Sequence, residues 1–425
     1  MKKLIFCFIA TLFITNVLYA QKGNNKPLKS LKTEINTAAI DSFENVIKKD
    51  INNKLIAGGI YLLYEKGKIV ATNIIGESDI STHTPLKRNS FFRIQSMTKP
   101  IASLALLLLQ EDGLINMNDR LDQYLPEFTN PVILDQIDTL NGVIVLRTHP
   151  AKSPILLRNL LTHTAGFASA FSKKQKELYA VTFKDAPKYD LAHFSNELSK
   201  LPLDFEPNEK WQYGPSINIA ARVIEKVSGM SFNDFLKKRI LEPMQMNDTK
   251  FYLDSADASR LTTLYTLDEK GEMVMTDPGN VTSRKISGPK VYYSASGGLI
   301  STLDDYLKFC VMILKNGMHE NKMIAKPETI ALMKMDQIPS YINSTADLPI
   351  GKPDKGFTFG YQILRRESNT SKLHENAISW AGSDCTIFFI DPKREVIGIY
   401  LTQNDKYNQI PSWQSFYSWM TKAIE

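Results

Sequence analysis

Two β-hairpin patterns stand near opposite ends of this chain of 425 residues, and they constrain its fold more than any other feature. The first covers 58–76, where two apolar runs flank a turn at 65–68, and the second covers 386–401, where two apolar runs flank 391–395. The sequence between them is mainly helical in its periodicity. Strands at both ends with helices between them predict an α+β fold. Its antiparallel sheet is built from the N- and C-terminal segments with flanking helices, and a mainly helical region at about 95–290 is inserted into it.

Helical patterns are clearest at 101–111, 155–164 and 218–227, and the first and third of these end close to a glycine. A last helix is expected at 412–424, where large apolar residues recur at i, i+3, i+4 and i+7. That stripe is typical of a core-facing helix and not of a cofactor site. A cleft is expected at the seam between the sheet and the inserted helices.

The N-terminus has the pattern of a secretory signal. Two lysines precede an apolar stretch at 4–17, which is shorter than the roughly 20 residues that a membrane span requires. Residues 1–20 are therefore predicted to be a signal peptide with cleavage after Ala20, and the protein is expected to be periplasmic or secreted. The polar segment 21–37 is predicted to be a flexible tether. Residues 38–425 are predicted to form the folded domain.

Composition excludes several classes of partner. The formal charge of +6 is mild, and no run of Lys and Arg alternates with aromatic residues, so nucleic acid is not an expected partner. No membrane span is expected once the signal is removed.

After export Cys310 and Cys385 remain, and we expect two buried free thiols, although a disulfide is chemically permitted outside the cytoplasm. His374 begins a zinc-helix pattern, but Ile378 stands where the second ligand belongs, so no metal and no cofactor are expected.

The strongest chemical signal is Ser96-Met97-Thr98-Lys99, which precedes the apolar run 101–109. A serine and a lysine three residues apart at the start of a helix share one face, with side-chain origins about 5–6 Å apart. A lysine whose charge is suppressed can take the serine proton, which makes the serine a nucleophile. A serine before an apolar helix can equally be an N-cap. No G-x-S-x-G elbow is present, which argues against an α/β-hydrolase.

Five short segments occur together in a recognisable order. They are Phe92-Arg93-Ile94-Gln95-Ser96-Met97-Thr98-Lys99-Pro100, Leu160-Leu161-Thr162-His163-Thr164-Ala165-Gly166-Phe167, Phe205-Glu206-Pro207-Asn208-Glu209-Lys210-Trp211-Gln212-Tyr213, Ser296-Gly297-Gly298-Leu299-Ile300-Ser301-Thr302 and Trp380-Ala381-Gly382. On these segments the chain, from about residue 40 to 424, resembles the serine β-lactamase-like family. That family includes class C β-lactamases, D-Ala-D-Ala carboxypeptidases and family VIII carboxylesterases, and the resemblance implies its penicillin-recognising fold.

The resemblance places Tyr213 at the tyrosine of the family's Y-x-N motif. A cationic lysine nearby would favour its phenolate, which could accept the serine proton and pass it to the leaving group. The alternative is a core tyrosine with a paired hydroxyl. Residue 215 departs from the motif, because it is proline where the lactamases and peptidases have asparagine.

Trp380-Ala381-Gly382 corresponds to the family's K-T-G strand, with tryptophan in place of lysine as in the family VIII esterases. The resemblance implies that these three residues bind substrate. The backbone N–H groups of Ser96 and Ser383 are expected to form the oxyanion hole. The alternative for Trp380 is a packing residue on a buried strand.

Other motif residues are expected to support the site. His163 is predicted to be structural, because Lys99 and Tyr213 already supply the proton chemistry. Asn208 replaces the usual glycine after Pro207 and tolerates a positive φ. The Ser-Gly-Gly segment at 296–298 is predicted to be a turn beside the cleft, and the cations of 284–290 are predicted to lie in a segment that borders it.

These observations predict an exported serine hydrolase that acts through a Ser96 acyl-enzyme on a small-molecule acyl substrate, most of all short-chain carboxylic esters. The first alternative is a β-lactamase or D-Ala-D-Ala carboxypeptidase. An alternative of another class is a penicillin-fold binding protein without turnover. The sequence does not determine the acyl group, the base or the oligomeric state.

Overall fold

The computed structural model describes residues 35–425 except 142, 340, 345–353 and 369–371. Residues 1–34 lie outside the described residues, so the predicted signal peptide and most of the predicted tether are not described. The first described helix, α1, spans Thr37–Asn52.

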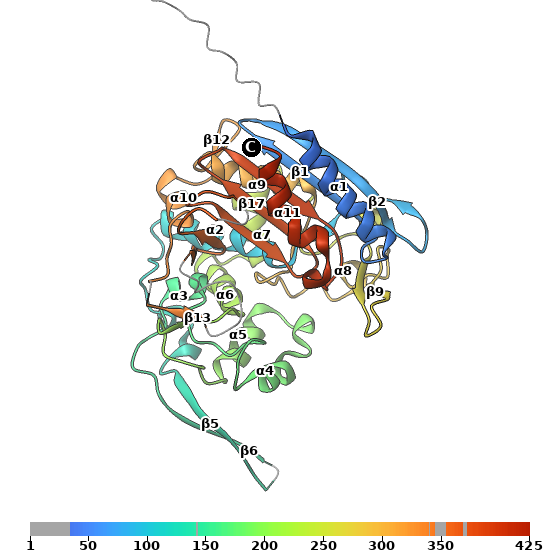
Figure 1. Cartoon of the computed structure of the whole chain (residues 1–425). Helices are drawn as coiled ribbons and strands as arrows, with labels where there is room; N and C mark the ends of the chain where they lie inside the picture. The colour runs from blue at the N-terminus through green and yellow to red at the C-terminus, as the bar shows by residue number, and fades with distance from the viewer. Residues whose placement is uncertain (1–34, 142, 340, 345–353, 369–371) are drawn as a thin grey trace, which may run out of the picture. The chain divides into compact units, whose positions relative to one another are not determined.

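An eight-stranded antiparallel sheet organises the molecule, in the order β14-β15-β16-β17-β18-β1-β2-β3. Its strands are β1 (Gly58–Glu65), β2 (Lys68–Asp79), β3 (Thr84–Pro85), β14 (Lys355–Phe357), β15 (Gln362–Leu364), β16 (Ile378–Gly382), β17 (Thr386–Asp391) and β18 (Val396–Leu401). Figure 1 shows the N-terminal strands β1 and β2 beside the C-terminal β17, with α1 and α11 (Pro411–Lys422) lying over them. The N-terminal β1 pairs with the C-terminal β18, from Ile60 opposite Leu401 to Glu65 opposite Val396. Both predicted hairpins are present as β1–β2 and β17–β18. The predicted α+β fold with a two-ended sheet is confirmed.

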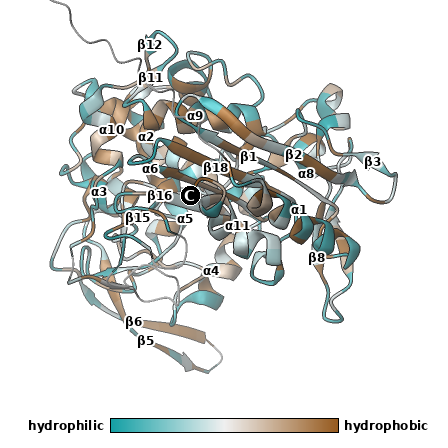
Figure 2. Ribbon diagram, turned by 45° about the horizontal axis from the view of Figure 1, so that its top comes forward, coloured by the Kyte–Doolittle hydropathy of each residue, from teal (hydrophilic) through white to brown (hydrophobic). Residues whose placement is uncertain are grey.

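Both faces of the central strands are buried because helices cover each of them. On one face Tyr61 and Leu63 of β1 pack with Phe43 of α1 and Phe416 of α11. The alternate β1 residues, among them Leu62, face a larger core with α2 (Thr98–Glu111) and α9 (Leu303–Leu314). Because successive strand side chains point to opposite faces, β1, which is buried along its whole length, supplies both layers. Figure 2 shows the hydrophobic colour along these central strands.

The inserted region is mainly helical, as predicted. Its helices are α3 (Leu157–Thr162), α4 (Lys176–Phe183), α5 (Leu191–Ser199), α6 (Ser216–Ser228), α7 (Phe232–Leu236) and α8 (Arg284–Ser287). Helix α3 ends where His163 takes a left-handed φ of 58°, and α6 ends at Gly229 with a φ of 69°. Helix α2 is buried along almost its whole length, which explains its unbroken apolar run.

The structure adds elements that the sequence patterns do not single out. A hairpin of β5 (Val132–Leu140) and β6 (Val143–Pro150) extends from the helical region, and its strands carry exposed apolar residues (Figures 1 and 2). The remaining elements are β4 (Phe92–Arg93), β7 (Lys210–Trp211), β8 (Leu264–Leu267), β9 (Met273–Asp277), β10 (Ile300–Ser301), β11 (Met318–His319), β12 (Lys322–Met323), α10 (Pro327–Met333) and β13 (Asn343–Ser344).

Cys310 lies in α9, and Cys385 lies directly before β17. Both are buried free cysteines, as expected. Burial raises the pKa of both thiols well above the ordinary value, which suppresses the reactive thiolate. Within the described part of the chain no helix has the length and apolar character needed to cross a bilayer.

Candidate active site

Ser96 lies in a single 3-10 turn, η1 (Gln95–Met97), which follows β4 and leads directly into α2. The residue before it, Gln95, takes a left-handed φ of 45°, a conformation that is uncommon outside glycine. The backbone therefore turns sharply at the serine, and its side chain lies on a cavity wall instead of in the core.

Lys99 and Tyr213 meet at the Ser96 hydroxyl. Lys99 Nζ donates to Ser96 Oγ at 3.1 Å, and the Tyr213 hydroxyl donates to the same oxygen at 2.7 Å. Lys99 Nζ also lies 4.5 Å from the centroid of the Tyr213 ring. The structure thus brings together three predicted residues that come from two segments more than a hundred positions apart.

Burial, and not the lysine charge, controls the protonation of this group. Desolvation lowers the pKa of Lys99 to about 7, because no carboxylate compensates its charge. Desolvation also raises the pKa of Tyr213 well above its ordinary value, although its hydrogen bond to Ser96 opposes this. The expectation of a Tyr213 phenolate is therefore wrong. The arrangement suits Lys99 as the base and Tyr213 as a neutral hydrogen-bond donor.

This titration predicts a pH profile. Lys99 must lose its proton to act as a base, so kcat/KM is expected to rise with pH through an apparent pKa of about 7. The measurement is hydrolysis of p-nitrophenyl acetate from pH 5 to 9, with the rate of a Ser96→Ala variant subtracted at each pH. A profile that is flat below pH 8 would contradict a lysine base.

Two site residues were missed or undervalued in the sequence. The Ser296 carbonyl, in a segment expected only to pack near the cleft, accepts from Lys99 Nζ at 2.6 Å. Asn218 Oδ1 accepts from the Ser296 N–H at 3.0 Å, and Asn218 Nδ2 donates to the Tyr292 hydroxyl at 2.8 Å. Asn218 lies in the first turn of α6, three residues after Pro215. The one indication in the sequence was the side-chain amide of Asn218. It lies about one helical turn after position 215, where the family motif has asparagine and this chain has proline.

The segment Trp380–Gly382 forms the end of β16 and packs against the turn that carries Ser96. A Cβ on Gly382 would lie 2.4 Å from the Ile94 carbonyl oxygen, so only glycine permits this approach. The Trp380 ring lies 5.6 Å from the Tyr213 ring, centroid to centroid. Residues 380–383 themselves do not line the cavity described below.

A side-chain hydrogen bond joins the two segments that carry the proposed oxyanion N–H groups. Gln95 precedes Ser96 and Asp384 follows Ser383, and Gln95 Nε2 donates to Asp384 Oδ2 at 2.6 Å. Gln403 Nε2 also donates to the backbone carbonyls of Arg93 and Asp384 at 3.2 and 3.3 Å. These contacts fix the Ser96 turn against the β16–β17 connection.

His163 is buried and its ring lies 4.7 Å from the Tyr213 ring. Its Nδ1 is 2.9 Å from Ser216 Oγ, and burial lowers its pKa well below the ordinary value. A neutral, packed imidazole agrees with the predicted supporting role. Asn208 takes a φ of 68°, as expected for the residue that replaces glycine.

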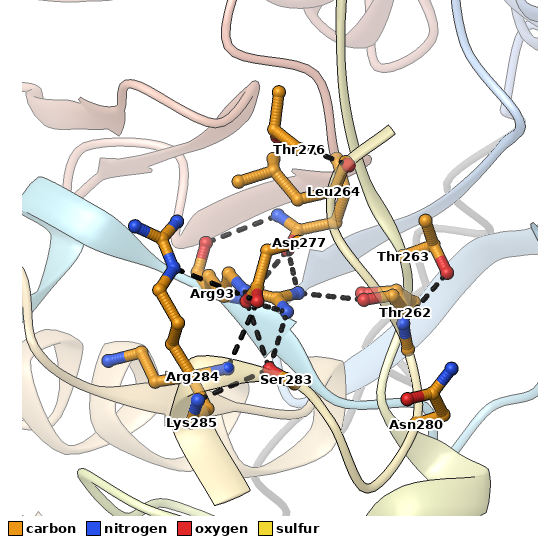
Figure 3. Close-up of polar contacts among 12 residues, drawn as sticks. Arg93, Thr262, Thr263, Leu264, Thr276, Asp277, Asn280, Ser283, Arg284 and Lys285 are labelled. Carbon is orange, nitrogen blue, oxygen red and sulfur yellow. Dashed lines mark hydrogen bonds and ion pairs between the residues drawn. The ribbon is translucent and has the colours of Figure 1, made fainter. Parts of the chain in front are cut away.

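A cavity of about 650 Å³ opens beside Ser96. Its wall combines aromatic and cationic side chains. Apart from Lys99 and Tyr213, its aromatic and charged lining residues are Arg93, Phe171, Tyr179, Lys188, Tyr252, Asp277, Arg284, Lys285 and Tyr292. Figure 3 shows part of this wall, in which Asp277 faces Arg93 beside Ser283. In the described residues no group of three or more His, Cys, Asp or Glu is arranged to hold a metal.

The fold and this site define a serine hydrolase with the penicillin-recognising architecture. The sequence model of the family described as "Beta-lactamase" matches residues 43–411, and the chain belongs to this β-lactamase family. Several relatives, among them the following two, are similar over most of their length. A Mycobacterium tuberculosis protein named Rv1367c is 29% identical, over 86% of this chain and 90% of its own. Lovastatin esterase from Penicillium rubens is 24% identical, over 80% of this chain and 84% of its own.

The fold is also similar to a solved structure described as EstCE1, a hydrolase with promiscuous acyltransferase activity. The TM-score is 0.75 at 22% identity, and the match covers 92% of this chain and 99% of the other. At this level of identity the likeness shows the fold.

Proposed function

We propose that the chain is an exported serine hydrolase that forms an acyl-enzyme at Ser96 and acts on short-chain carboxylic esters. The observation that carries the proposal is the convergence of Lys99 Nζ and the Tyr213 hydroxyl on Ser96 Oγ, at 3.1 and 2.7 Å, beside an open cavity. A core serine would not need a desolvated lysine and a buried phenol on one oxygen.

In this mechanism Ser96 Oγ attacks the ester carbonyl carbon as its proton passes to neutral Lys99. The N–H groups of Ser96 and Ser383 stabilise the negative oxygen of the tetrahedral intermediate. As the C–O bond to the alcohol breaks, Tyr213 donates its proton to the departing oxygen and regains one from Lys99. Water then attacks the acyl-enzyme by the same proton route, which releases the acid and restores the Ser96 hydroxyl.

Two departures from the lactamase pattern favour esters over β-lactams. Trp380 replaces the lysine that serves family members as an anchor for the substrate carboxylate, and an indole offers one neutral donor. Pro215 has no side-chain amide to hold the substrate amide, and Asn218 is already engaged by Ser296 and Tyr292. An ester also has a better leaving group than an amide. The esterase among the relatives supports the same preference.

The test compares kcat/KM for p-nitrophenyl acetate and butyrate, a chromogenic cephalosporin and a D-Ala-D-Ala peptide. We expect the esters to be hydrolysed at least tenfold more efficiently than the cephalosporin. A cephalosporin value above that for p-nitrophenyl acetate would restore the β-lactamase alternative. Covalent labelling of Ser96 by a fluorophosphonate with no substrate consumed would favour the binding-protein alternative.

Export is the second element of the proposal and rests on the sequence of residues 1–20. It is tested by fusing residues 1–37 to a phosphatase that is active only outside the cytoplasm and expressing the fusion in a bacterial host. Phosphatase activity that requires the apolar stretch 4–17 would support export. A fusion that stays inactive inside the cell would contradict it.

A further inference from the structure

We propose that the cavity beside Ser96 contains an anion subsite formed by Lys285 and Arg284, and that the enzyme prefers esters whose alcohol portion carries a carboxylate or another anionic group. The inference rests on the proposed ester hydrolysis and names its substrate class. In the lactamases and peptidases of the family, a lysine at the position of Trp380 anchors the substrate anion. Here the anion would bind on another wall of the site, away from β16.

The cavity wall carries more positive charge than its own residues neutralise. Its charged members are Arg93, Lys99, Lys188, Asp277, Arg284 and Lys285, of which only Asp277 is acidic. Lys188 is paired with Asp185, outside the wall, at 2.7 Å, and Lys99 has a pKa of about 7. The positive charge left on the wall therefore depends on which cation Asp277 neutralises.

Asp277 is committed to Arg93. Arg93 Nε donates to Asp277 Oδ2 at 3.0 Å, Arg93 Nη2 donates to the same oxygen, and Ser283 Oγ adds a third hydrogen bond at 2.9 Å (Figure 3). Both side chains of this ion pair are buried. The backbone N–H of Arg284 donates to Asp277 Oδ1 at 3.1 Å, but its guanidinium Nε lies 3.8 Å from the same oxygen, and 79% of the side chain is exposed. Its guanidinium therefore keeps most of its donors free at the cavity.

Lys285 is the second uncompensated cation, and it lies deeper in the wall. Its Nζ donates to the Gly298 carbonyl at 2.6 Å, which uses one of its three N–H groups. Within the described residues no carboxylate lies within 4.0 Å of this nitrogen. The Gly298 and Ser296 carbonyls belong to one short turn, and Lys99 donates to the second of them. An anion on Lys285 would thus sit beside the same turn that holds the catalytic lysine.

Lys285 holds its proton less tightly than an exposed lysine, because it is buried with no carboxylate bonded to it. Desolvation lowers its pKa to about 8, and Arg93 and Arg284 add to the effect, whereas the charges of Asp277 and Asp384 oppose it. A bound carboxylate would supply a charge-assisted hydrogen bond and stabilise the ammonium form. The aromatic residues Tyr252 and Tyr292 on the same wall suit a flat ring next to that carboxylate.

The test uses a matched pair of acetate esters, 3-acetoxybenzoate and 3-acetoxybenzamide, which differ in the charge of the alcohol portion. The measured quantity is the ratio of their kcat/KM values at pH 7, which cancels any effect common to both substrates. We expect Lys285→Gln to lower the ratio about tenfold and Arg284→Gln to lower it about threefold. Arg284→Lys is expected to restore most of the preference.

Lys290→Gln is the matched control, because it removes one positive charge from the same segment. Lys290 Nζ is bonded to the Leu253 carbonyl at 2.8 Å, and its side chain does not line the cavity. The ratio is expected to be unchanged in this variant. Equal losses in all three glutamine variants would indicate long-range charge only and would overturn the subsite. A circular dichroism melt checks folding, and the exposed Arg284 provides a result even if Lys285→Gln does not fold.

The pH dependence gives a second readout. The ratio is expected to fall as the pH rises through about 8, because Lys285 loses its proton while the substrate carboxylate stays ionised. The titration of Lys99 affects both esters equally and cancels. A ratio that stays constant from pH 6.5 to 9 would overturn the role of Lys285.

Calorimetric Kd values for the product acid 3-hydroxybenzoate and for 3-hydroxybenzamide separate this inference from the proposed function, because binding requires no turnover. We expect the acid to bind more tightly, and the difference to shrink in Lys285→Gln but not in Lys290→Gln. Equal affinities for acid and amide would overturn the subsite even in an active esterase. Selective acid binding without ester hydrolysis would support the subsite and contradict the proposed function.

Discussion

Replacing Ser96 by alanine is expected to lower ester hydrolysis by about 10³-fold or more and to abolish covalent labelling. The hydroxyl that accepts from both Lys99 Nζ and the Tyr213 phenol is lost, so no acyl-enzyme is expected to form. The remaining rate above that of water would come from the oxyanion N–H groups and from substrate binding. The measurement combines p-nitrophenyl acetate kinetics with intact-protein mass after fluorophosphonate treatment.

The variant should fold, because the change removes one oxygen from a half-buried side chain on a cavity wall. A thermal melt within a few degrees of the unmodified protein is the control. Ser383→Ala is a matched substitution, since it also removes a hydroxyl but keeps the backbone N–H that the mechanism uses. An active Ser96→Ala enzyme would overturn the assignment of the nucleophile.

Lys99→Ala and Tyr213→Phe are each expected to slow acylation by about 10²-fold or more, and the double variant should be little slower than either one. Both groups act on the same proton of Ser96, and residues that act as a unit give non-additive losses. Pre-steady-state release of p-nitrophenol measures acylation separately from deacylation. Fully additive losses would mean that the two side chains do not share a proton path.

Tyr213→Phe provides a further distinction because it keeps the ring on which Lys99, His163 and Trp380 pack. If Lys99 alone is the base, the pH profile of Tyr213→Phe should still show an apparent pKa near 7. Its disappearance would assign the titration to the pair instead of to the lysine.

The two hairpins of the sheet were predictable because their strands carry local signals, whereas the short strands β3, β14 and β15 were not predicted. The apolar runs of β1, β17 and β18, with polar turns between hairpin partners, specify strands without knowledge of the rest of the chain. The convergence of Ser96, Lys99 and Tyr213 followed from motif spacing and from the resemblance. The position of a motif in a sequence, however, carries no information on desolvation.

That is why the protonation of Tyr213 was predicted wrongly. Its pKa depends on how completely the surrounding chain excludes water, which only the packed structure shows. Asn218 and the Ser296 carbonyl were missed for a related reason. A backbone carbonyl has no sequence signature, and an asparagine in a helix becomes informative only when its partner across the fold is known.

The pairing of β1 with β18 has a consequence for synthesis on the ribosome. Ser96 and α2 emerge early, yet the strand that completes the sheet beside β1 is among the last segments to be translated. The backbone N–H of Asn36 also donates to the carbonyl of Ala423 at 2.9 Å, which joins the first described helix to the end of the last. A chain released before Val396 therefore contains Ser96 and Lys99 but lacks the strand that joins β17 to β1. We therefore expect a chain that ends before Val396 to show no ester hydrolysis, because β1 then lacks its partner strand.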